Sequence, residues 1–171
     1  MSDPVWKPNS TVAAVIEHDG RYLLVEELQP EGLCFNQPAG HVEQGEALVD
    51  ACVREALEET GYRMRPTALV GIYQWTPPTR PGLTYLRFAY AAELLPTESL
   101  RPGLPVSRHD DAAAGVGQTA VLDEGIVRAV WLSYEEVLAC REQHRSPLVL
   151  QCIDDHRAGR RFPLDLIRHY E

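Results

Sequence analysis

The sequence contains no run of apolar residues long enough to cross a membrane. Its longest apolar stretches, residues 12–16 and 88–92, each end at a glutamate, whereas a membrane-spanning helix needs about 18 consecutive apolar residues. Residues 1–10 have neither the basic start nor the apolar stretch of a secretion signal. We therefore expect a cytoplasmic protein with no membrane partner, in which the two apolar stretches form buried strands.

Basic residues are also scarce. The chain has 171 residues, with 16 Lys and Arg against 25 Asp and Glu, which gives a net charge of −9. This balance argues against a protein that binds nucleic acid through a basic face. It does not exclude an anionic substrate, because a bound divalent cation can reverse the sign of a local acidic cluster.

Cysteine is sparse and scattered. The four cysteines show no CxxC spacing, so a zinc site or a redox pair of that type is not indicated. Cysteines with this distribution in a domain of this size are most simply reduced thiols in the core. We predict that role for Cys34, Cys52, Cys140 and Cys152.

The order of apolar runs and breaks predicts one mixed sheet covered by helices. The runs 11–18 and 22–28 are joined by Asp19-Gly20, which is typical of a tight hairpin. Residues 47–60 contain no Gly or Pro and are followed by Gly61, which predicts a helix and its end. A short segment follows over 33–37, further strands are expected over 68–75, 85–94 and 126–132, and helices after Ser133 and after Pro147, the latter ending near Gly159.

One segment does not fit this pattern. Residues 96–125 hold three prolines, an Ala112-Ala113-Ala114-Gly115 run and few large apolar residues. We interpret the segment as a long flexible loop or insertion within a single domain that spans residues 1–171.

The predicted helix over 47–60 carries an unusual cluster of carboxylates. Glu55, Glu58 and Glu59 are spaced i, i+3 and i+4, so they lie on one side of the helix. Their mutual repulsion and their place near the helix C-terminus are both unfavourable. A hard divalent cation such as Mg²⁺ would offset this, and Arg54 can orient a carboxylate. Taken alone, the spacing is more simply explained by a solvated acidic helix face with an Arg54–Glu58 ion pair.

The wider spacing resembles a known motif. The segment has the form G-x5-E-x7-R-E-U-x-E-E-x-G-U, where U is apolar, and resembles the Nudix box of the Nudix hydrolases. The specified positions hold Gly40, Glu46, Arg54, Glu55, Glu58, Glu59 and Gly61. The resemblance implies an α/β (α+β) fold, a Nudix-type α/β/α sandwich with a central mixed sheet, in which the box forms a loop-helix-loop.

Other segments are similar to the NudJ-type phosphatases within that superfamily. They cover roughly residues 7–95 and 126–168, and include Asn36-Gln37-Pro38-Ala39-Gly40-His41, Gln74-Trp75, Leu86-Arg87-Phe88 and Arg145-Ser146-Pro147-Leu148-Val149. This similarity implies hydrolysis of nucleoside di- and triphosphates, and of the pyrimidine pyrophosphates of thiamine metabolism, with release of orthophosphate.

The family resemblance also implies site residues. Glu55, Glu58 and Glu59 would bind Mg²⁺ or Mn²⁺ with the backbone carbonyl of Ala39. The catalytic set would be Glu55, Arg54 and Glu58, with Glu55 the first choice for the general base and Glu59 for the main metal ligand, although these two roles can exchange. Gly40, Glu46 and Gly61 would be structural, and Glu46 and Arg54 would stabilise the loop-helix-loop.

The sequence leaves open the roles of a further acidic residue and of the candidate substrate contacts. Asp123 and Glu124 are candidates for an additional base or ligand, but ordinary loop acids are the simpler interpretation. Arg87 interrupts an apolar strand and points either into the site or to an exposed strand face. Trp75 and Tyr73 share a strand face and either stack on a substrate ring or pack in the core. His41 and, more weakly, Gln37 either contact phosphate or stabilise the loop.

Several functional alternatives remain at this stage. One is a pyrophosphatase acting on ADP-ribose, for which the position of Pro77 after the box is a weak indication, or on 8-oxo-dGTP. Another is a Nudix-fold module that binds a ligand without catalysis. The expected partner is a small phosphoanhydride substrate, with no nucleic acid and no membrane, for a monomer or homodimer.

Overall fold

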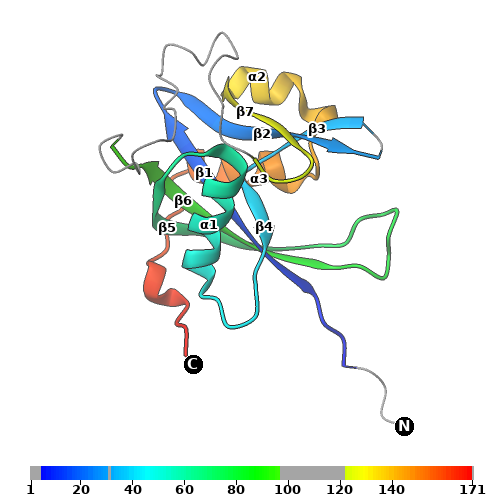
Figure 1. The fold of residues 1–171 in the computed structure, drawn as a ribbon, viewed down its shortest axis with the longest axis vertical. Coiled ribbons are helices and arrows are strands. Elements are labelled where there is room, and N and C mark those ends of the chain that lie inside the picture. The colour runs from blue at the N-terminus through cyan, green and yellow to red at the C-terminus, as the bar shows by residue number, and fades with distance from the viewer. Residues whose placement is uncertain (1–4, 31, 97–121, 171) are drawn as a thin grey trace.

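The chain forms a mixed sheet with helices on both faces (Figure 1). The computed structural model describes residues 5–30, 32–96 and 122–170. Its strands are β1 (Asn9–His18), β2 (Arg21–Gln29), β3 (Gly32–Asn36), β4 (Ala39–His41), β5 (Met64–Trp75), β6 (Tyr85–Leu94) and β7 (Ile126–Ser133). Its α-helices are α1 (Leu48–Thr60), α2 (Tyr134–Ala139) and α3 (Leu148–Arg157), with short 3₁₀ turns at Arg141–Gln143 and Leu164–Leu166.

The sheet is centred on β1. Its strand order is β3-β2-β1-β6-β5, with β4 also paired to β1 and β7 to β2. The β1–β6 pair is parallel and the other strand pairs are antiparallel. The predicted mixed sheet is therefore confirmed, and β1 lies where both halves of the sheet meet.

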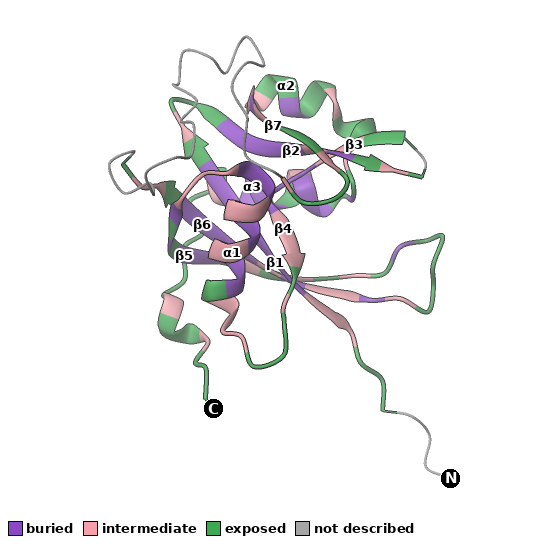
Figure 2. Cartoon of the chain, in the orientation of Figure 1, coloured by how far each residue is buried: buried purple, intermediate pink, exposed green. Residues whose placement is uncertain are grey.

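Two apolar cores lie on opposite faces of this sheet. Successive residues of a strand point to opposite faces, and β1 is buried from Thr11 to Ile16. The core that includes Val12 and Leu69 is covered by α1, and the core that includes Ala13 and Val70 is covered by α3. Figure 2 shows the resulting buried centre of the sheet. This arrangement is the predicted α/β/α sandwich.

Turn and capping residues in the sequence determine most of the ends of the helices and strands. Asp19 and Gly20 have φ values of 49° and 76°, as the two-residue hairpin turn between β1 and β2 requires. The α1 helix ends where Gly61 takes φ 71° and its N–H donates to the carbonyl of Leu57. The Ser133–Glu136 capping box starts α2. The prediction of a loop over 96–125 falls mainly on residues 97–121, which lie outside the described residues.

The cysteines and the surface are consistent with the composition. All four cysteines are free thiols; Cys52 and Cys152 are buried, whereas Cys34 and Cys140 are only partly buried, so the predicted core role holds fully for two of them.

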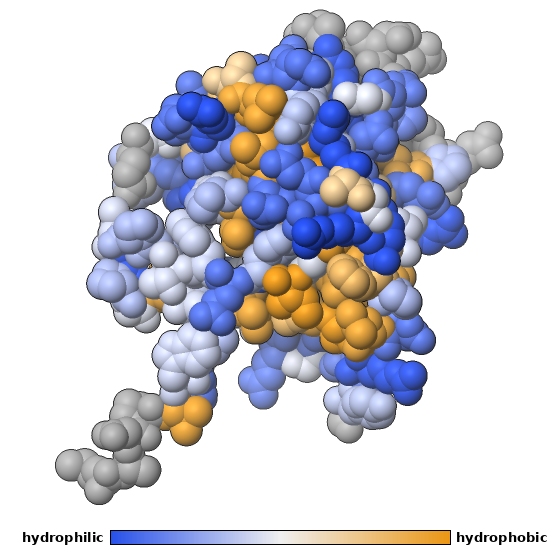
Figure 3. All heavy atoms as spheres, turned by 180° about the vertical axis from the view of Figure 1, so that it is seen from behind, coloured by the Kyte–Doolittle hydropathy of each residue, from blue (hydrophilic) through white to orange (hydrophobic). Residues whose placement is uncertain are grey.

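Figure 3 shows hydrophobic patches among a mainly hydrophilic rear surface. None of the helices in the described ranges combines the length and the apolar character needed to span a bilayer.

A histidine on α3 should make the fold sensitive to acid. His156 lies edge to face against Tyr22, with 3.3 Å between its Nδ1 and the tyrosine hydroxyl. Burial, reinforced by Arg161 and opposed by Glu17, lowers the pKa of His156 to about 4. The unfolded chain therefore binds more protons than the folded chain between about pH 6.5 and pH 4, and stability falls as the pH falls through that window.

Between pH 7.5 and pH 4.5, we expect the free energy of unfolding to fall by about 1–2 kcal/mol less in His156→Gln than in the wild-type protein. The difference is no larger because the partial exposure of His156 screens the effect. The measurement is the free energy of unfolding in urea at pH 7.5 and pH 4.5. His169→Gln, at an exposed position near the C-terminus, is the matched control. Equal pH slopes for the wild-type protein and His156→Gln would contradict the prediction.

Candidate active site

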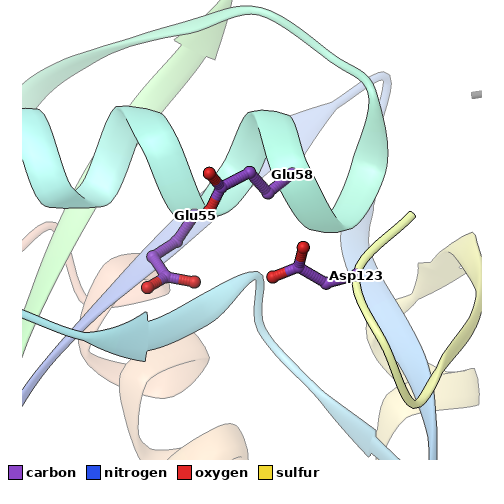
Figure 4. Close-up of side chains that lie close together, drawn as sticks. All are labelled: Glu55, Glu58 and Asp123. Atoms are coloured by element: carbon purple, nitrogen blue, oxygen red, sulfur yellow. The ribbon is translucent and has the colours of Figure 1, made fainter. Parts of the chain in front are cut away.

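Three carboxylates from two distant parts of the chain converge beside the end of α1. Carboxylate oxygens of Glu55, Glu58 and Asp123 all lie within 4.8 Å of one another (Figure 4). Glu55 is buried, whereas Asp123 is exposed. Oxygen atoms in such a group are the ligands that Mg²⁺ and Mn²⁺ prefer. The donor set therefore fits a hard divalent cation.

Asp123 is held at this place by the helix end. Its backbone N–H donates to the carbonyl of Glu58 at 3.3 Å, and its own carbonyl accepts from Ile126 at 3.0 Å. The sequence favoured ordinary loop acids here, but the structure brings Asp123 to the carboxylates, while Glu124 lines the neighbouring cavity. A contact between residues 65 positions apart in the chain leaves no local pattern, so only the fold could separate the two acids.

Glu59 faces β4, the strand that precedes the helix. Its Oε2 accepts a hydrogen bond from the backbone N–H of Ala39 at 2.8 Å, so the structure brings together the two residues predicted to share a ligand role. Burial raises the pKa of Glu59 to about 9, opposed by the Ala39 N–H and reinforced by nearby carboxylates such as Glu27 and Glu55. Glu59 thus lies in a dry, acidic part of the site, one helical turn from Glu55.

Arg54 holds the acidic side chains in place. Its Nε and Nη2 bind both oxygens of Glu46, at 2.8 and 2.9 Å. Its Nη1 donates to Glu55 at 2.8 Å and Glu58 at 3.0 Å, and its Nη2 also reaches the carbonyl of His41 at 3.1 Å. The guanidinium hydrogen bond lowers the pKa of Glu46. Arg54 therefore connects the loop, the helix and two carboxylates of the cluster.

Glu55 is subject to opposing effects on its pKa. Burial raises its pKa, and the neighbouring Glu58 and Asp123 act in the same direction, while Arg54 opposes them. One guanidinium thus faces several crowded carboxylates. A cation bound among these carboxylates would reduce the mutual repulsion that Arg54 does not neutralise.

Because only a planar guanidinium can make these contacts together, Arg54→Lys should destabilise the fold. We expect a loss of about 1–2 kcal/mol in the free energy of unfolding, measured by urea denaturation. Arg65→Lys is the matched control, because its exposed ion pair with Glu93 should contribute under about 0.5 kcal/mol. Equal losses in the two variants would show that the network around Arg54 has no special stabilising role.

The box glycines have distinct structural reasons. A Cβ on Gly40 would lie 2.1 Å from the carboxyl carbon of Glu55, so the absence of a side chain lets the buried carboxylate approach β4. Gly61 occupies the left-handed region at the end of α1. The supporting roles of Gly40, Glu46 and Gly61 stay predictions, and these contacts are the ones through which they would act.

A cavity of about 780 Å³ adjoins the carboxylates. Its walls come from β3, β4, the hairpin between β5 and β6, and the start of α3. This volume is in the range of small-molecule sites. Glu59 lines its inner wall, so the cavity and the acidic helix turn share one boundary.

The residues predicted to contact the substrate lie in different environments in the structure. Arg87 is buried and lines the cavity, which excludes the exposed-face alternative. Its guanidinium donates to the side-chain oxygens of Asn36 at 3.4 Å and Gln37 at 3.3 Å. Gln37 is fully buried, and its amide donates to the carbonyl of Val149. Gln37 therefore contacts Arg87, which lines the cavity, and is itself not among the lining residues.

The aromatic candidates also differ. Trp75 lines the cavity with its ring near-parallel to Tyr85, at 6.0 Å between centroids. Tyr73, which like Trp75 packs against the core beside α3, is not among the cavity-lining residues, and its hydroxyl donates to Asp155 at 2.8 Å. His41 is exposed, lines the cavity and lies 6.3 Å from Tyr85. Of the two strand aromatics, only Trp75 is placed to meet a ligand.

Some cavity residues were not singled out from the sequence. Glu27, Thr11 and Ser146 line it, and Asn36 lines it while donating to Glu27 at 2.9 Å. Thr11, Asn36 and Ser146 fall within segments that resembled the NudJ-type phosphatases, which was the available signal. Glu27 follows a buried apolar run on β2, where its polar partners become visible only in three dimensions.

Comparison with known proteins identifies the family of this chain. The model of the NUDIX domain family matches residues 6–152. Phosphatase NudJ of Escherichia coli strain K12 is 37% identical over 163 residues, which cover 95% of this chain and 92% of that protein. A NUDIX hydrolase structure from Nitrosomonas europaea is 47% identical, covers 96% of this chain and 98% of its own, and has a TM-score of 0.80.

A more distant structure shares only the fold. An ADP-ribose pyrophosphatase from Streptococcus suis has a TM-score of 0.58 at 17% identity, with 96% of this chain and 97% of that chain covered. The family match covers most of the chain, including the carboxylates on α1 and the loop before them. The chain therefore belongs to the Nudix hydrolase family and is an enzyme of the class that hydrolyses phosphoric anhydrides.

Proposed function

We propose that this protein is a Mg²⁺-dependent phosphohydrolase of small organic di- and triphosphates that releases orthophosphate. The observation that carries the proposal is the convergence of Glu55, Glu58 and Asp123 next to a cavity lined by the buried Arg87. The similarity to Phosphatase NudJ over 95% of the chain supports orthophosphate as the product. Nucleoside di- and triphosphates and pyrimidine pyrophosphates are the proposed substrate class.

Several oxygen donors would hold the metal. They are Glu55, Glu58 and Asp123, with Glu59 and the carbonyl of Ala39 on the adjoining wall. Mg²⁺, or Mn²⁺ in its place, would neutralise charge that develops on the phosphoryl oxygens and lower the pKa of a bound water. More carboxylates than guanidinium groups lie at this turn of α1, and this excess of negative charge supports a cation bound among them.

The chain's own groups would divide the remaining work. Glu55 is proposed to accept the proton of the attacking water, since it is the buried member of the three-carboxylate group; Glu59, which is buried nearby, is the alternative base. Arg54 would position the carboxylates without contacting the substrate. Arg87 would donate hydrogen bonds to the bound molecule from the cavity wall.

The alternatives have less support. A pyrophosphatase acting on ADP-ribose has a similar fold but only distant sequence similarity. For 8-oxo-dGTP, no contact in the described part of the cavity points to that base. A module that binds without catalysis would not need a complete set of box carboxylates. A cytoplasmic location and a monomeric or homodimeric state stay predictions.

The deciding experiment is a substrate panel with Mg²⁺ in which orthophosphate and pyrophosphate are scored separately. We expect orthophosphate from nucleoside diphosphates, nucleoside triphosphates and a pyrimidine pyrophosphate, and no product when EDTA removes the metal. Pyrophosphate or nucleoside monophosphate from ADP-ribose or 8-oxo-dGTP would overturn the phosphatase assignment. Tight metal-dependent binding with no product over hours would favour the non-catalytic module.

A further inference from the structure

Glu27 is a buried carboxylate beside the cavity and outside the Nudix box. It lies on β2, is 7% exposed, and lines the cavity together with Asn36 and Arg87. Its Oε1 accepts a hydrogen bond from the side-chain amide of Asn36 at 2.9 Å, and its Oε2 accepts from Gln29 at 3.1 Å. The Nε of Arg145 is 3.7 Å from Oε2, which is too long for a hydrogen bond. Burial of a carboxylate held mainly by neutral amides is costly, and this cost points to a role beyond packing.

The carboxylate determines which atom of Asn36 faces Arg87. An ionised carboxylate only accepts hydrogen bonds, so the amide of Asn36 turns its N–H group toward Glu27. The side-chain oxygen of Asn36 then faces Arg87, whose Nη1 and Nη2 both donate to it at 3.4 Å. In the reverse orientation, the amide N–H group would face a guanidinium, which also only donates. Glu27 therefore acts on Arg87 through Asn36, by keeping an acceptor in front of the guanidinium.

Gln37 shows the same arrangement with a backbone group in place of the carboxylate. Its amide N–H donates to the carbonyl of Val149 at 2.7 Å, and its side-chain oxygen accepts from Nη1 of Arg87 at 3.3 Å. Each of the two amide oxygens is thus oriented by an acceptor behind it. The acceptor behind Gln37 belongs to the main chain, whereas the acceptor behind Asn36 is the side chain of Glu27, which a substitution can change.

The direction of this guanidinium matters because Arg87 faces the cavity. Arg87 is 8% exposed and is among the residues that line the cavity. A guanidinium carries its five N–H donors in one rigid plane, so the acceptors on one side of the plane determine where the remaining donors point. The contacts to Asn36 and Gln37 are long, at 3.3–3.4 Å, and the loss of one acceptor would let the plane turn.

We propose that Glu27 is a positioning residue for the hydrolytic reaction, because through Asn36 it holds Arg87 in the direction in which the guanidinium donates to the substrate. The inference rests on the proposed function, in which Arg87 binds the substrate. It adds to the site a carboxylate that neither belongs to the Nudix box nor touches the substrate. The role is the same whichever part of the substrate Arg87 contacts.

An exchange of the two polar groups tests the proposal. In Glu27→Gln, the nearby cation Arg145 favours the new amide oxygen at the position of Oε2, so the new amide N–H faces Asn36 and reverses its orientation. Asn36→Asp alone brings two carboxylates together, which is also unfavourable. In the double variant, the carboxylate at position 36 accepts from both of its neighbours and again presents an oxygen to Arg87.

The kinetic prediction separates binding from turnover. With Mg²⁺ and uridine diphosphate, we expect KM to rise about tenfold in Glu27→Gln and in Asn36→Asp, which corresponds to about one hydrogen bond from a charged group. We expect kcat to change by less than about threefold, because the lost contact holds the bound substrate and its transition state alike. The double variant should return to within about threefold of the wild-type KM.

Glu26→Gln is the matched control. Glu26 is the preceding residue of β2, pairs with the exposed Arg128 at 2.7 Å, and is not among the residues that line the cavity. Its substitution also removes one negative charge and one ion pair, but it leaves Asn36 and Arg87 in place. We expect the KM of this variant to equal that of the wild-type protein.

A second readout does not depend on turnover. The Nε–H of Arg87 should give a distinct ¹⁵N NMR signal in the metal-free protein, identified by its loss in Arg87→Lys. We expect this signal to shift in Glu27→Gln and in Asn36→Asp and to return in the double variant. If no substrate yields orthophosphate, the proposed function fails, and the NMR comparison still decides whether Glu27 orients Arg87.

Two results would overturn the positioning role. A double variant with the same raised KM as Glu27→Gln would show that Glu27 contacts the substrate itself. An unchanged Arg87 signal in Glu27→Gln would show that the carboxylate does not orient the guanidinium.

Discussion

Glu55→Gln is expected to reduce the Mg²⁺-dependent release of orthophosphate by about a thousandfold. Glutamine keeps the size and shape of the side chain but cannot take a proton from water at neutral pH, and it is a poor ligand for a hard cation. Glu55 is the buried member of the carboxylate group and lies beside Arg54 at 2.8 Å. The measurement is initial rate against Mg²⁺ concentration, with the best substrate of the panel.

Stability distinguishes a catalytic from a structural role for Glu55. Burial raises the pKa of this carboxyl group, so the fold already disfavours its charge. We therefore expect the metal-free variant to melt at the same or a higher temperature than the wild-type protein. Glu135→Gln, on the exposed side of α2, should leave both activity and melting temperature unchanged. Retained activity in Glu55→Gln would exclude Glu55 as the base and move that role to Glu59.

Local sequence signals were sufficient for most of the architecture. The Asp19-Gly20 turn, the stop at Gly61 and the capping box at Ser133 each depend on residues within one turn of one another, and each is found where the sequence predicts it. The strands β3 and β4 were not predicted, and β5 begins at Met64 rather than residue 68. There the edge pairing with β6 extends a strand beyond its apolar run.

The site was only partly accessible from sequence, because it depends on contacts between distant segments. The helix spacing placed Glu55 and Glu58 correctly on one side of α1, but the approach of Asp123 depends on a hydrogen bond to the end of that helix. Whether Arg87 faces solvent or the cavity was likewise undecidable, since the polarity of a strand residue does not say which face is covered. The buried oxygens of Asn36 and Gln37 that hold Arg87 settle the question.

Gly40→Ala should give the second large loss of activity, through a residue with no reactive group. The new Cβ would lie 2.1–2.2 Å from the carboxyl carbon and both oxygens of Glu55, so the carboxylate has to move by more than an ångström. A displacement of about 1 Å in a catalytic group can cost about a hundredfold in rate. We expect a loss of that size in kcat/KM, measured with Mg²⁺ and the same substrate as for Glu55→Gln.

The fold should tolerate this change. Gly40 does not have a positive φ, and the atoms that the Cβ meets belong to the end of a flexible side chain, so the free energy of unfolding should change by less than about 1 kcal/mol. Gly82→Ala is the matched control, since a Cβ there meets no atom within 4 Å and its φ is also not positive. We expect Gly82→Ala to retain full activity.

A double-mutant comparison tests whether Gly40 acts through Glu55. If the alanine lowers activity by displacing that carboxylate, it should cost little more once Glu55→Gln has already removed the carboxylate, because two changes that act on one group do not add. A full hundredfold further loss in the Glu55→Gln background would point instead to the pairing of Gly40 with Val12 between β4 and β1. The non-additive result would show that the first glycine of the Nudix box is needed here to make room for a carboxylate.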